Sequence, residues 1–274
     1  MSRVIVLGSI NVDLETRLES YPQPGEKVMA QSLSRYAGGK GANQAVAARA
    51  QGADVIMVGA VGDDDAGRAS LNRLYARGIK LYVDRVPQVP TGHAIIFSDG
   101  RTNSIAVVSG ANAKVGSRPL DPIRGMGPSD ILLMQLETPV NTVAEAARQA
   151  ARHGVRVIIN AAPYTDLPSD VVALADPLVV PEEALDDFEA SGARPASLVV
   201  LRGKDGLDWD GVRYTGDVVP DDQVVDTVGA TDALVGTLAA ALVRGNDRAQ
   251  AAKLALDAAA ANVRHSGSQP EPRL

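Results

Sequence analysis

The sequence predicts a doubly wound α/β fold, in which a mostly parallel sheet is covered by helices on both faces. Short, continuous apolar runs recur along the chain and are bounded by Gly, Asp or Pro, as is typical of strands buried on both faces. Amphipathic helical patterns lie between many of these runs. Two segments, 12–36 and 91–109, break the alternation with extended, turn-rich sequence, and we expect them to form a small separate sheet, a lid or a dimer surface.

The expected elements follow one another along the whole chain. The apolar runs predict strands at 4–7, 55–58, 131–134, 155–159, 178–180 and 198–201. The helical patterns predict helices at 41–50, 66–77 and 140–153, with two more near 232–243 and 247–263. No internal repeat or low-complexity linker divides the sequence, so residues 1–274 are expected to form one domain with an excursion.

Composition excludes several classes of function. The net charge is −6 and no block of Lys or Arg occurs, which argues against a nucleic-acid partner or an anionic membrane surface. The absence of cysteine excludes disulfides, thiolate metal sites and cysteine nucleophiles. No segment approaches the roughly 20 apolar residues of a membrane span, and the first apolar run is too short for a signal peptide. A cytoplasmic protein is therefore expected.

The segment 226–232, Asp-Thr-Val-Gly-Ala-Thr-Asp, carries the most informative chemistry. Gly229 and Ala230 form a turn that runs directly into an apolar helical pattern. This places backbone N–H groups and the positive end of a helix dipole beside the carboxylate of Asp232. Such an arrangement can hold a migrating phosphoryl group while the carboxylate takes a proton from an attacking hydroxyl.

A glycine-rich turn precedes the first helix, with the sequence Gly-Gly-Lys-Gly-Ala-Asn-Gln at 38–44. Its glycines allow close approach of a ligand, and Lys40 and Asn43 offer hydrogen-bond donors. It is not a Walker loop, because no Ser or Thr follows the lysine at the required spacing. On its own, the turn is more typical of a simple helix start than of a binding site.

Two further polar motifs lie at the ends of expected strands, where ligands bind in open α/β sheets. Asn11 and Asp13 are two residues apart, so in an extended chain they point the same way and suit sugar hydroxyls. A turn or cap explains them equally well. Glu137 ends a buried strand, where it either contacts a ligand or supplies negative charge to the next helix N-terminus.

Other polar groups favour structural roles. The three histidines, His93, His153 and His265, have no metal-binding spacing and no Ser or Asp partner that suggests a triad. The acidic run at 63–65 resembles a metal cluster, but it is more typical of a cap on the helix that follows.

Together, four of these motifs resemble the ribokinase (PfkB) family of carbohydrate kinases in order and approximate spacing, over nearly the whole chain. They lie at 8–13, 38–43, 134–137 and 226–232. The resemblance implies a ribokinase-like doubly wound sheet with a small β-sheet lid formed by the segments 12–36 and 91–109. It also implies transfer of the ATP γ-phosphoryl to a sugar hydroxymethyl, and a homodimer through the lid.

The resemblance implies a role for individual residues. Asp232 would be the catalytic base, and the backbone from Gly229 through Ala230 and Thr231 to Asp232 would form the anion hole. The residues that would hold the sugar are Asn11, Asp13, Gly39, Lys40, Gly41, Asn43, Glu137 and Asp232. Magnesium would bridge the ATP phosphates, and a monovalent cation, usually potassium, would lie near Asp226, Val228 and Gly267.

The nucleotide side departs from the family pattern. The family usually has Asn-x-x-Glu after the strand near 177–180, where this chain has Glu182 and Leu185. Thr231 replaces a third glycine and would be strained if that glycine used a positive φ. The segment 185–196 is short and is expected to lack a helix. The residues expected at the nucleotide are Glu182, Arg202, Gly203, Lys204, Gly206 and Thr231.

The classes of function therefore stay open at this stage. The first is an active ribose or pentose kinase with an altered nucleotide site. The second is a sugar-binding pseudokinase with little or no phosphoryl transfer. A kinase for a nucleoside or another sugar is the third. Asp232 favours activity, because a chain freed from catalysis needs no base there, whereas Leu185 and Thr231 favour decay.

Overall fold

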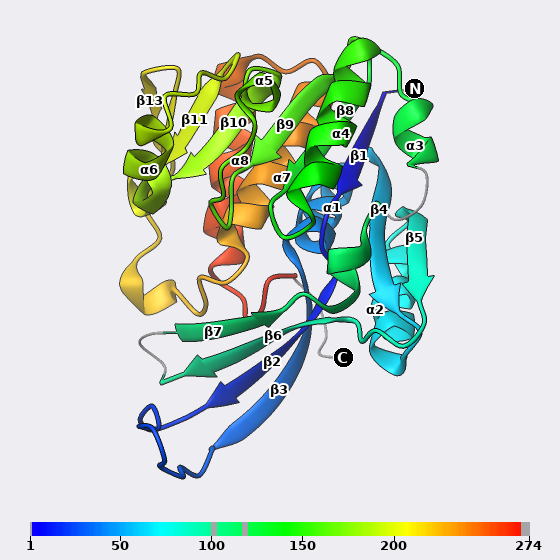
Figure 1. Ribbon diagram of the computed structural model, residues 1–274. Coiled ribbons are helices and arrows are strands. Elements are labelled where there is room, and N and C mark those ends of the chain that lie inside the picture. The colour runs from blue at the N-terminus through cyan, green and yellow to red at the C-terminus, as the bar shows by residue number, and fades with distance from the viewer. Residues whose placement is uncertain (1, 100–102, 117–119, 270–274) are drawn as a thin grey trace.

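A computed structural model describes residues 2–99, 103–116 and 120–269 of the chain. Two sheets organise it (Figure 1). The larger sheet has nine strands in the order β13-β12-β11-β10-β9-β8-β1-β4-β5, and the smaller has four in the order β3-β2-β6-β7. Helices cover both faces of the larger sheet, as the sequence predicts, and the smaller sheet projects from one end of it.

The larger sheet is parallel from β5 to β11 and ends in an antiparallel hairpin. Along the chain, strands β4 and β5 are added on one side of β1, and the strands from β8 onward are added on the other. The direction in which strands are added therefore reverses between β1 and β8. Ligands bind at such a reversal in open α/β sheets. Its strands are β1 (Arg3–Leu7), β4 (Asp54–Gly62), β5 (Lys80–Val86), β8 (Ile131–Gln135), β9 (Arg156–Asn160), β10 (Ala175–Pro181), β11 (Leu198–Leu201), β12 (Leu207–Trp209) and β13 (Val212–Tyr214).

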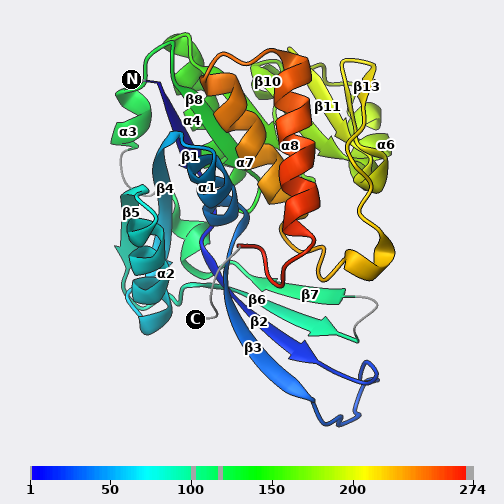
Figure 2. The ribbon, with the colours of Figure 1, turned by 180° about the vertical axis from the view of Figure 1, so that it is seen from behind.

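The strand side chains alternate between two apolar cores, one on each face. In β1, Val4 and Val6 enter one core, whereas Ile5 and Leu7 enter the other. The first core is covered by α1 (Lys40–Ala50), α2 (Asp65–Ala76), α7 (Ala230–Val243) and α8 (Arg248–Asn262), which Figure 2 shows in front. The second is covered by α3 (Asp121–Arg124), α4 (Val140–Arg152), α5 (Ser169–Val172) and α6 (Leu185–Ala190).

The five predicted helices agree with the observed α1, α2, α4, α7 and α8 to within two residues at each end. The acidic run at 63–65 caps a helix as expected, because the Asp64 side chain accepts a hydrogen bond from the Gly67 N–H at 2.7 Å. One expectation is wrong. The segment 185–196 contains a helix, α6, whose residue Phe188 is buried against the second core.

The smaller sheet is built by the two segments that interrupt the alternation. It contains β2 (Asn11–Arg17), β3 (Ser32–Gly38), β6 (Gly92–Ser98) and β7 (Asn103–Val108). Strand β2 pairs antiparallel with β3 and parallel with β6, and β7 forms an exposed edge. Because β2 starts soon after β1 ends, the junction between the two sheets lies at the ligand edge of the larger one.

Short 3-10 turns complete the structure at η1 (Gly110–Lys114), η2 (Glu182–Ala184), η3 (Gly203–Asp205) and η4 (Asp221–Gln223). Within the described part of the chain, every helix is too short or too polar to cross a lipid bilayer.

Candidate active site

The carboxylate of Asp232 lies in the first turn of α7, where it is only 4% exposed. Two amide side chains from α1 hold it. Asn43 Nδ2 donates to Asp232 Oδ2 and Gln44 Nε2 donates to Asp232 Oδ1, both at 2.9 Å. A buried carboxylate that accepts charge-assisted hydrogen bonds on both oxygens is held in one orientation. The structure therefore places Asp232 against the glycine-rich turn predicted to bind sugar.

The remaining polar residues of the predicted sugar site converge on the same place. On β2, the Asn11 Oδ1 atom accepts from Asn112 Nδ2 at 2.7 Å, which fixes the orientation of the buried Asn11 amide. The Glu137 carboxylate accepts from Ser9 Oγ at 2.5 Å and from the Lys40 backbone N–H at 3.4 Å. The motifs at the ends of β1 and β8 and at the start of α1 thus form one cluster.

Three glycines allow this close approach. Gly39 has φ 90°, and a Cβ added there would lie 2.6 Å from the Asn11 backbone nitrogen. A Cβ on Gly38 would lie 2.1 Å from the Asp13 carboxylate, and one on Gly41 would lie 2.6 Å from the Gly8 carbonyl carbon. Because no side chain fits at these positions, the glycines bring the start of α1 against the end of β1.

The cluster contains three carboxylates and one ammonium group. Burial raises the pKa of Asp13 to about 7, and the negative charges of Glu137 and Asp232 add to the effect. The pKa of Lys40 is raised mainly by the charge of Asp232, against the opposing effect of its own burial. The ammonium of Lys40 therefore offsets part of the negative charge of the carboxylates, and Asp13 is close to protonation at neutral pH.

The raised pKa of Asp13 leads to a pH prediction. The sequence predicts that Asp13 holds sugar hydroxyls, and a carboxyl group accepts hydrogen bonds on both oxygens only when it is ionised. The sugar KM is therefore expected to rise as pH falls from 8 to 6. With the Asp13 pKa at about 7, the rise is about tenfold at most. The same raised pKa affects folding stability in the opposite direction. The folded state is stabilised when Asp13 is protonated, so the free energy of unfolding falls as pH rises towards 7.

Steady-state kinetics of the native protein and of Asp13→Asn across this pH range provide the check. The variant is expected to have a higher sugar KM that no longer depends on pH. If the sugar KM changed equally with pH in both proteins, the pH dependence would come from a group other than Asp13.

The residues of the predicted anion hole lie at the N-terminus of α7. Gly229 is the N-cap residue with φ 82°, and the Ala233 N–H donates to the Gly229 carbonyl at 2.8 Å. Helix geometry leaves the N–H groups of Thr231 and Asp232 without an acceptor inside the helix. The N–H group of Ala230 is less available to an anion, because it already donates to the Thr227 carbonyl at 3.3 Å.

The expectation of strain at Thr231 is wrong. Among the described residues, the non-glycine positions with positive φ are Gln88 and Asp210. Thr231 instead lies in the first turn of α7, where a β-branched residue adopts ordinary helical geometry. The left-handed residue in this turn is Gly229 alone, so threonine at the third position leaves the backbone of the hole intact.

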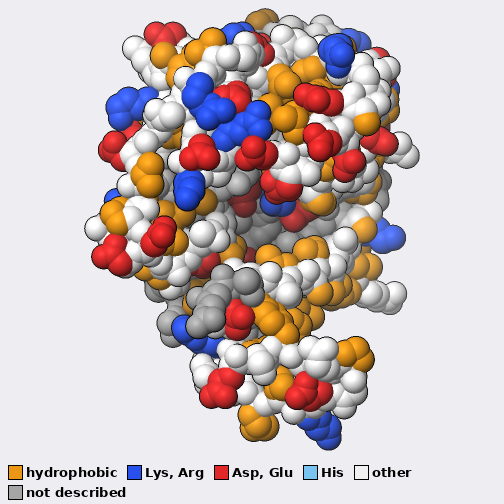
Figure 3. Space-filling model, turned by 90° about the vertical axis from the view of Figure 1, so that its left-hand side faces the viewer, with side chains coloured by type: hydrophobic (Ala, Val, Ile, Leu, Met, Phe, Trp, Pro, Cys, Tyr) orange, Lys and Arg blue, Asp and Glu red, His pale blue; other side chains and the backbone are white. Residues whose placement is uncertain are grey.

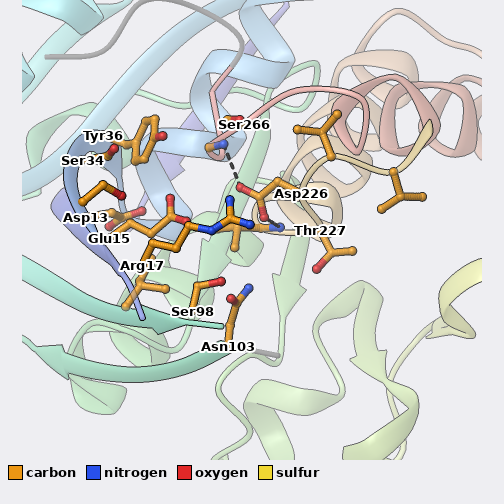
Figure 4. Close-up of a pocket in the computed structure, with 16 residues that line it drawn as sticks. Asp13, Glu15, Arg17, Ser34, Tyr36, Ser98, Asn103, Asp226, Thr227 and Ser266 are labelled. Carbon is orange, nitrogen blue, oxygen red and sulfur yellow. Dashed lines mark hydrogen bonds between the residues drawn. The ribbon is translucent and has the colours of Figure 1, made fainter. Parts of the chain in front are cut away.

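The three residues expected at a monovalent cation also lie together (Figure 4). The Asp226 carboxylate accepts from the Val228 N–H at 2.9 Å and from the Gly267 N–H at 2.8 Å. These bonds fix the loop that precedes α7 to the segment that follows α8. Each carboxylate oxygen keeps a further lone pair, which suits a hard cation that prefers oxygen ligands.

Of the residues expected at the nucleotide, all but Thr231 gather at the ends of β10 and β11. Arg202 Nη1 lies 2.8 Å from Glu182 Oε1, and Arg202 Nε lies 2.9 Å from Asp208 Oδ2. The Arg202 guanidinium is thus shared between two carboxylates. The loop that follows contains Gly203, Lys204 and Gly206, and Gly206 has φ 94°. By contrast, Leu185 packs against the second apolar core, so it takes no part in this polar group.

A cavity of about 400 Å³ opens between the smaller sheet and two segments of the larger unit, the loop that precedes α7 and the loop that follows α8. Figure 3 shows the recess, and Figure 4 shows Asp13, Glu15 and Arg17 of β2 pointing into it towards Asp226. The lining is mostly polar. It comprises Asp13, Glu15, Arg17, Ser32, Ser34, Tyr36, Ile96, Ser98, Asn103, Val224–Val228, Ser266 and Gly267.

Several residues of this site lie outside the roles expected from sequence. Gln44 lies inside the glycine-rich motif, so its position next to Asn43 was a usable signal. Ser9 likewise lies inside the motif at 8–13, whereas Asn112 and Gln269 carry no such signal, because their roles depend on the tertiary structure. Gln269 Nε2 donates to Asn43 Oδ1 at 2.9 Å, across 226 residues of sequence.

Comparison with known proteins agrees with this arrangement. The model of the pfkB family of carbohydrate kinases matches residues 1–273. The ribokinase of Bacillus subtilis is 36% identical over 98% of this chain and 95% of its own length. The deoxyribokinase of Salmonella typhi is 33% identical over 97% of this chain and 94% of its own length.

A solved structure of Arabidopsis thaliana ribokinase, complexed with ribose and ATP, superposes with a TM-score of 0.85 at 28% identity. The superposition covers 99% of this chain and 96% of the other. It confirms the predicted fold class, including the separate small sheet.

Proposed function

The chain belongs to the pfkB family of carbohydrate kinases, and we propose that it transfers the γ-phosphoryl group of ATP to the 5-hydroxyl of D-ribose. The observation that carries this proposal is the position of Asp232. Its buried carboxylate lies between the amides of α1 and the first N–H groups of α7. A base and an anion-binding helix terminus are therefore adjacent, as phosphoryl transfer to a hydroxyl requires.

In the proposed reaction, Asn11, Asp13 and Glu137 hold the sugar hydroxyls and orient the hydroxymethyl towards Asp232. The Asp232 carboxylate takes the hydroxyl proton as the oxygen attacks the γ-phosphorus. The N–H groups of Thr231 and Asp232 stabilise the negative charge of the transferring group. Lys40 limits the negative charge around the base, since its ammonium couples to Asp232, Glu137 and Asp13.

Two cations complete the proposal. Within the described residues, no group of three or more His, Asp or Glu side chains could hold a metal ion by itself. We therefore assign magnesium to the phosphates of ATP, where it neutralises charge during transfer. Potassium would be held by Asp226 together with backbone oxygens of its loop.

A sugar-dependent ADP assay tests the proposed function. The purified protein with ribose, MgATP and potassium is expected to form ADP, and 2-deoxyribose, other pentoses and nucleosides are compared at equal concentration. Removal of potassium is expected to lower kcat, and chelation of magnesium to abolish turnover. Ribose binding by calorimetry without ADP formation from any of these acceptors would instead indicate a pseudokinase.

The nucleotide site makes its own prediction. The Arg202–Glu182 pair cancels the negative charge that Glu182 brings to the ligand edge. Arg202→Ala exposes that charge to the phosphates of ATP, so we expect the ATP KM to rise about tenfold with sugar KM unchanged. The Glu182→Gln change alone is expected to have little effect, and adding it to Arg202→Ala is expected to restore most of the ATP affinity.

The native protein, the two single variants and the double variant form a double-mutant cycle. It separates the effect of the Glu182 charge from a direct contact between Arg202 and the phosphates. If the double variant stays as weak for ATP as Arg202→Ala, then Arg202 contacts the phosphates itself.

We also propose a homodimer through the smaller sheet. Its edge strand β7 is exposed along all six residues, with Ile105 53% and Val107 52% exposed. An unpaired edge with apolar side chains is a template for a second copy. Light scattering is expected to give twice the monomer mass, and Ile105→Lys to give the monomer. A monomeric native protein would contradict this arrangement.

A further inference from the structure

A chain of buried amide side chains leads away from Asp232 into the larger sheet. Gln44 Nε2 donates to Asp232 Oδ1 at 2.9 Å, and Gln44 Oε1 accepts from Gln135 Nε2 at 2.6 Å. Both glutamines are fully buried. Gln135 is the last residue of β8, and two hydrogen bonds in series connect it to the predicted base.

The order of donors and acceptors along this chain has one consistent direction. An ionised carboxylate only accepts hydrogen bonds, so Gln44 must present its NH₂ group to Asp232. Its carbonyl oxygen then points the other way and needs a donor, which Gln135 supplies. Without that donor, rotation of the Gln44 amide would place its carbonyl oxygen against the Asp232 carboxylate. Gln135 therefore determines which end of Gln44 faces the base.

Two glycines make room for this chain. A Cβ on Gly8 would lie 1.9 Å from Gln135 Oε1, so the Gln135 side chain occupies the space that any other residue at position 8 would fill. A Cβ on Gly236 would lie 2.3 Å from the Gln44 backbone carbonyl. Gly236 is one turn after Asp232, so it lets α7 approach α1 closely enough for Gln44 to reach the carboxylate.

We infer that Gln44 and Gln135 are positioning residues that hold the Asp232 carboxylate in its catalytic orientation, with Gln135 acting through Gln44. This inference rests on the proposed function, because it takes Asp232 as the base. It adds two residues to that function, neither of which contacts sugar or ATP in the proposed reaction.

Methionine replaces either glutamine with similar length and no hydrogen bond. We expect Gln44→Met to lower kcat about 30-fold and Gln135→Met about tenfold, on the scale of a lost charge-assisted hydrogen bond and its orienting partner. The sugar KM should stay within about twofold. The double variant should match Gln44→Met, because Gln135 has no effect once Gln44 is gone.

Asn160→Leu is the matched control. Asn160 pairs in register with Gln135 on the next strand, is fully buried, and its amide has no hydrogen-bond partner among the described residues. Its replacement disturbs the same layer without removing a hydrogen bond of the amide chain, so kcat should be unchanged. Melting temperature and calorimetric ribose binding are measured for every variant, and kcat is expressed per ribose-binding site.

The outcomes separate the inference from the function. A native kcat in Gln135→Met, or losses that add in the double variant, would overturn the positioning role. An equal loss in Asn160→Leu would also overturn it, since the effect would then come from packing. Asp232→Asn in the same assay tests the function itself: if Asp232→Asn is inactive while Gln135→Met is native, only the positioning role fails.

Discussion

Asp232→Asn is expected to remove nearly all sugar-dependent ADP formation, with kcat lowered about 10³-fold, the middle of the range for loss of a general base. The asparagine keeps the size of the side chain but cannot accept the proton of the attacking hydroxyl. It also places an NH₂ group against one of two amide donors, Asn43 or Gln44, which then loses its acceptor. The sugar KM should change less than kcat, because the other hydroxyl-binding residues are untouched.

The measurement is single-sugar steady-state kinetics with ribose-dependent ADP formation. Asp222→Asn is a suitable control, since it removes one negative charge from an exposed turn that precedes α7. Equal low turnover in the native protein and in Asp232→Asn would mean that the chain lacks base-catalysed transfer. A native rate in Asp232→Asn would assign the base elsewhere.

The core of the fold was predictable because its elements carry their own signals. Strands β1, β8 and β9 are buried on both faces and read as continuous apolar runs, and α4 and α7 are long enough to establish their periodicity. The helix α6 was missed because it has six residues and buries only Phe188 deeply, so too little of its pattern is apolar.

Pairings between distant segments were harder to predict. Strand β2 pairs in parallel with β6, which lies more than 70 residues later, and only tertiary packing specifies that register. The antiparallel hairpin of β12 and β13 consists of two three-residue strands, too short to show a period.

The candidate site divides in the same way. Motif residues such as Asn43 and Asp232 could be named from sequence, because glycine turns and helix starts mark them. Their direct contact could not, since it joins α1 to α7 across 189 residues. The ion pair between Glu182 and Arg202 shows a further limit, because the sequence placed both residues near the nucleotide but did not indicate that their side chains contact each other.

Gly229→Ala is expected to lower kcat about 100-fold, the effect of losing one preorganised donor in an oxyanion-type site. Gly229 has φ 82°, which costs an alanine about 1–2 kcal/mol. The added Cβ would also lie 2.5 Å from the Cα of Ser268. Relief of that contact requires α7 or the segment at 267–268 to move.

Gly245→Ala separates the two causes. Gly245 also has a positive φ, 86°, but a Cβ there meets nothing within 4 Å. Its replacement should lower the free energy of unfolding by about 1 kcal/mol, the cost of the left-handed conformation, and leave kcat unchanged. A kcat in Gly229→Ala equal to that of Gly245→Ala would show that the turn relaxes without disturbing the anion hole.

The kinetic pattern of Gly229→Ala also identifies which side moves. The Ser268 hydroxyl donates to Asp13 Oδ2 at 3.4 Å, so displacement of Ser268 acts on the sugar side and raises the sugar KM. Displacement of α7 instead moves the N–H groups of Thr231 and Asp232 away from the transferring phosphoryl and lowers kcat alone. Because Gly229 is the N-cap residue of α7, a change of its backbone conformation acts directly on the first turn of that helix, so we expect both effects, with the larger one in kcat.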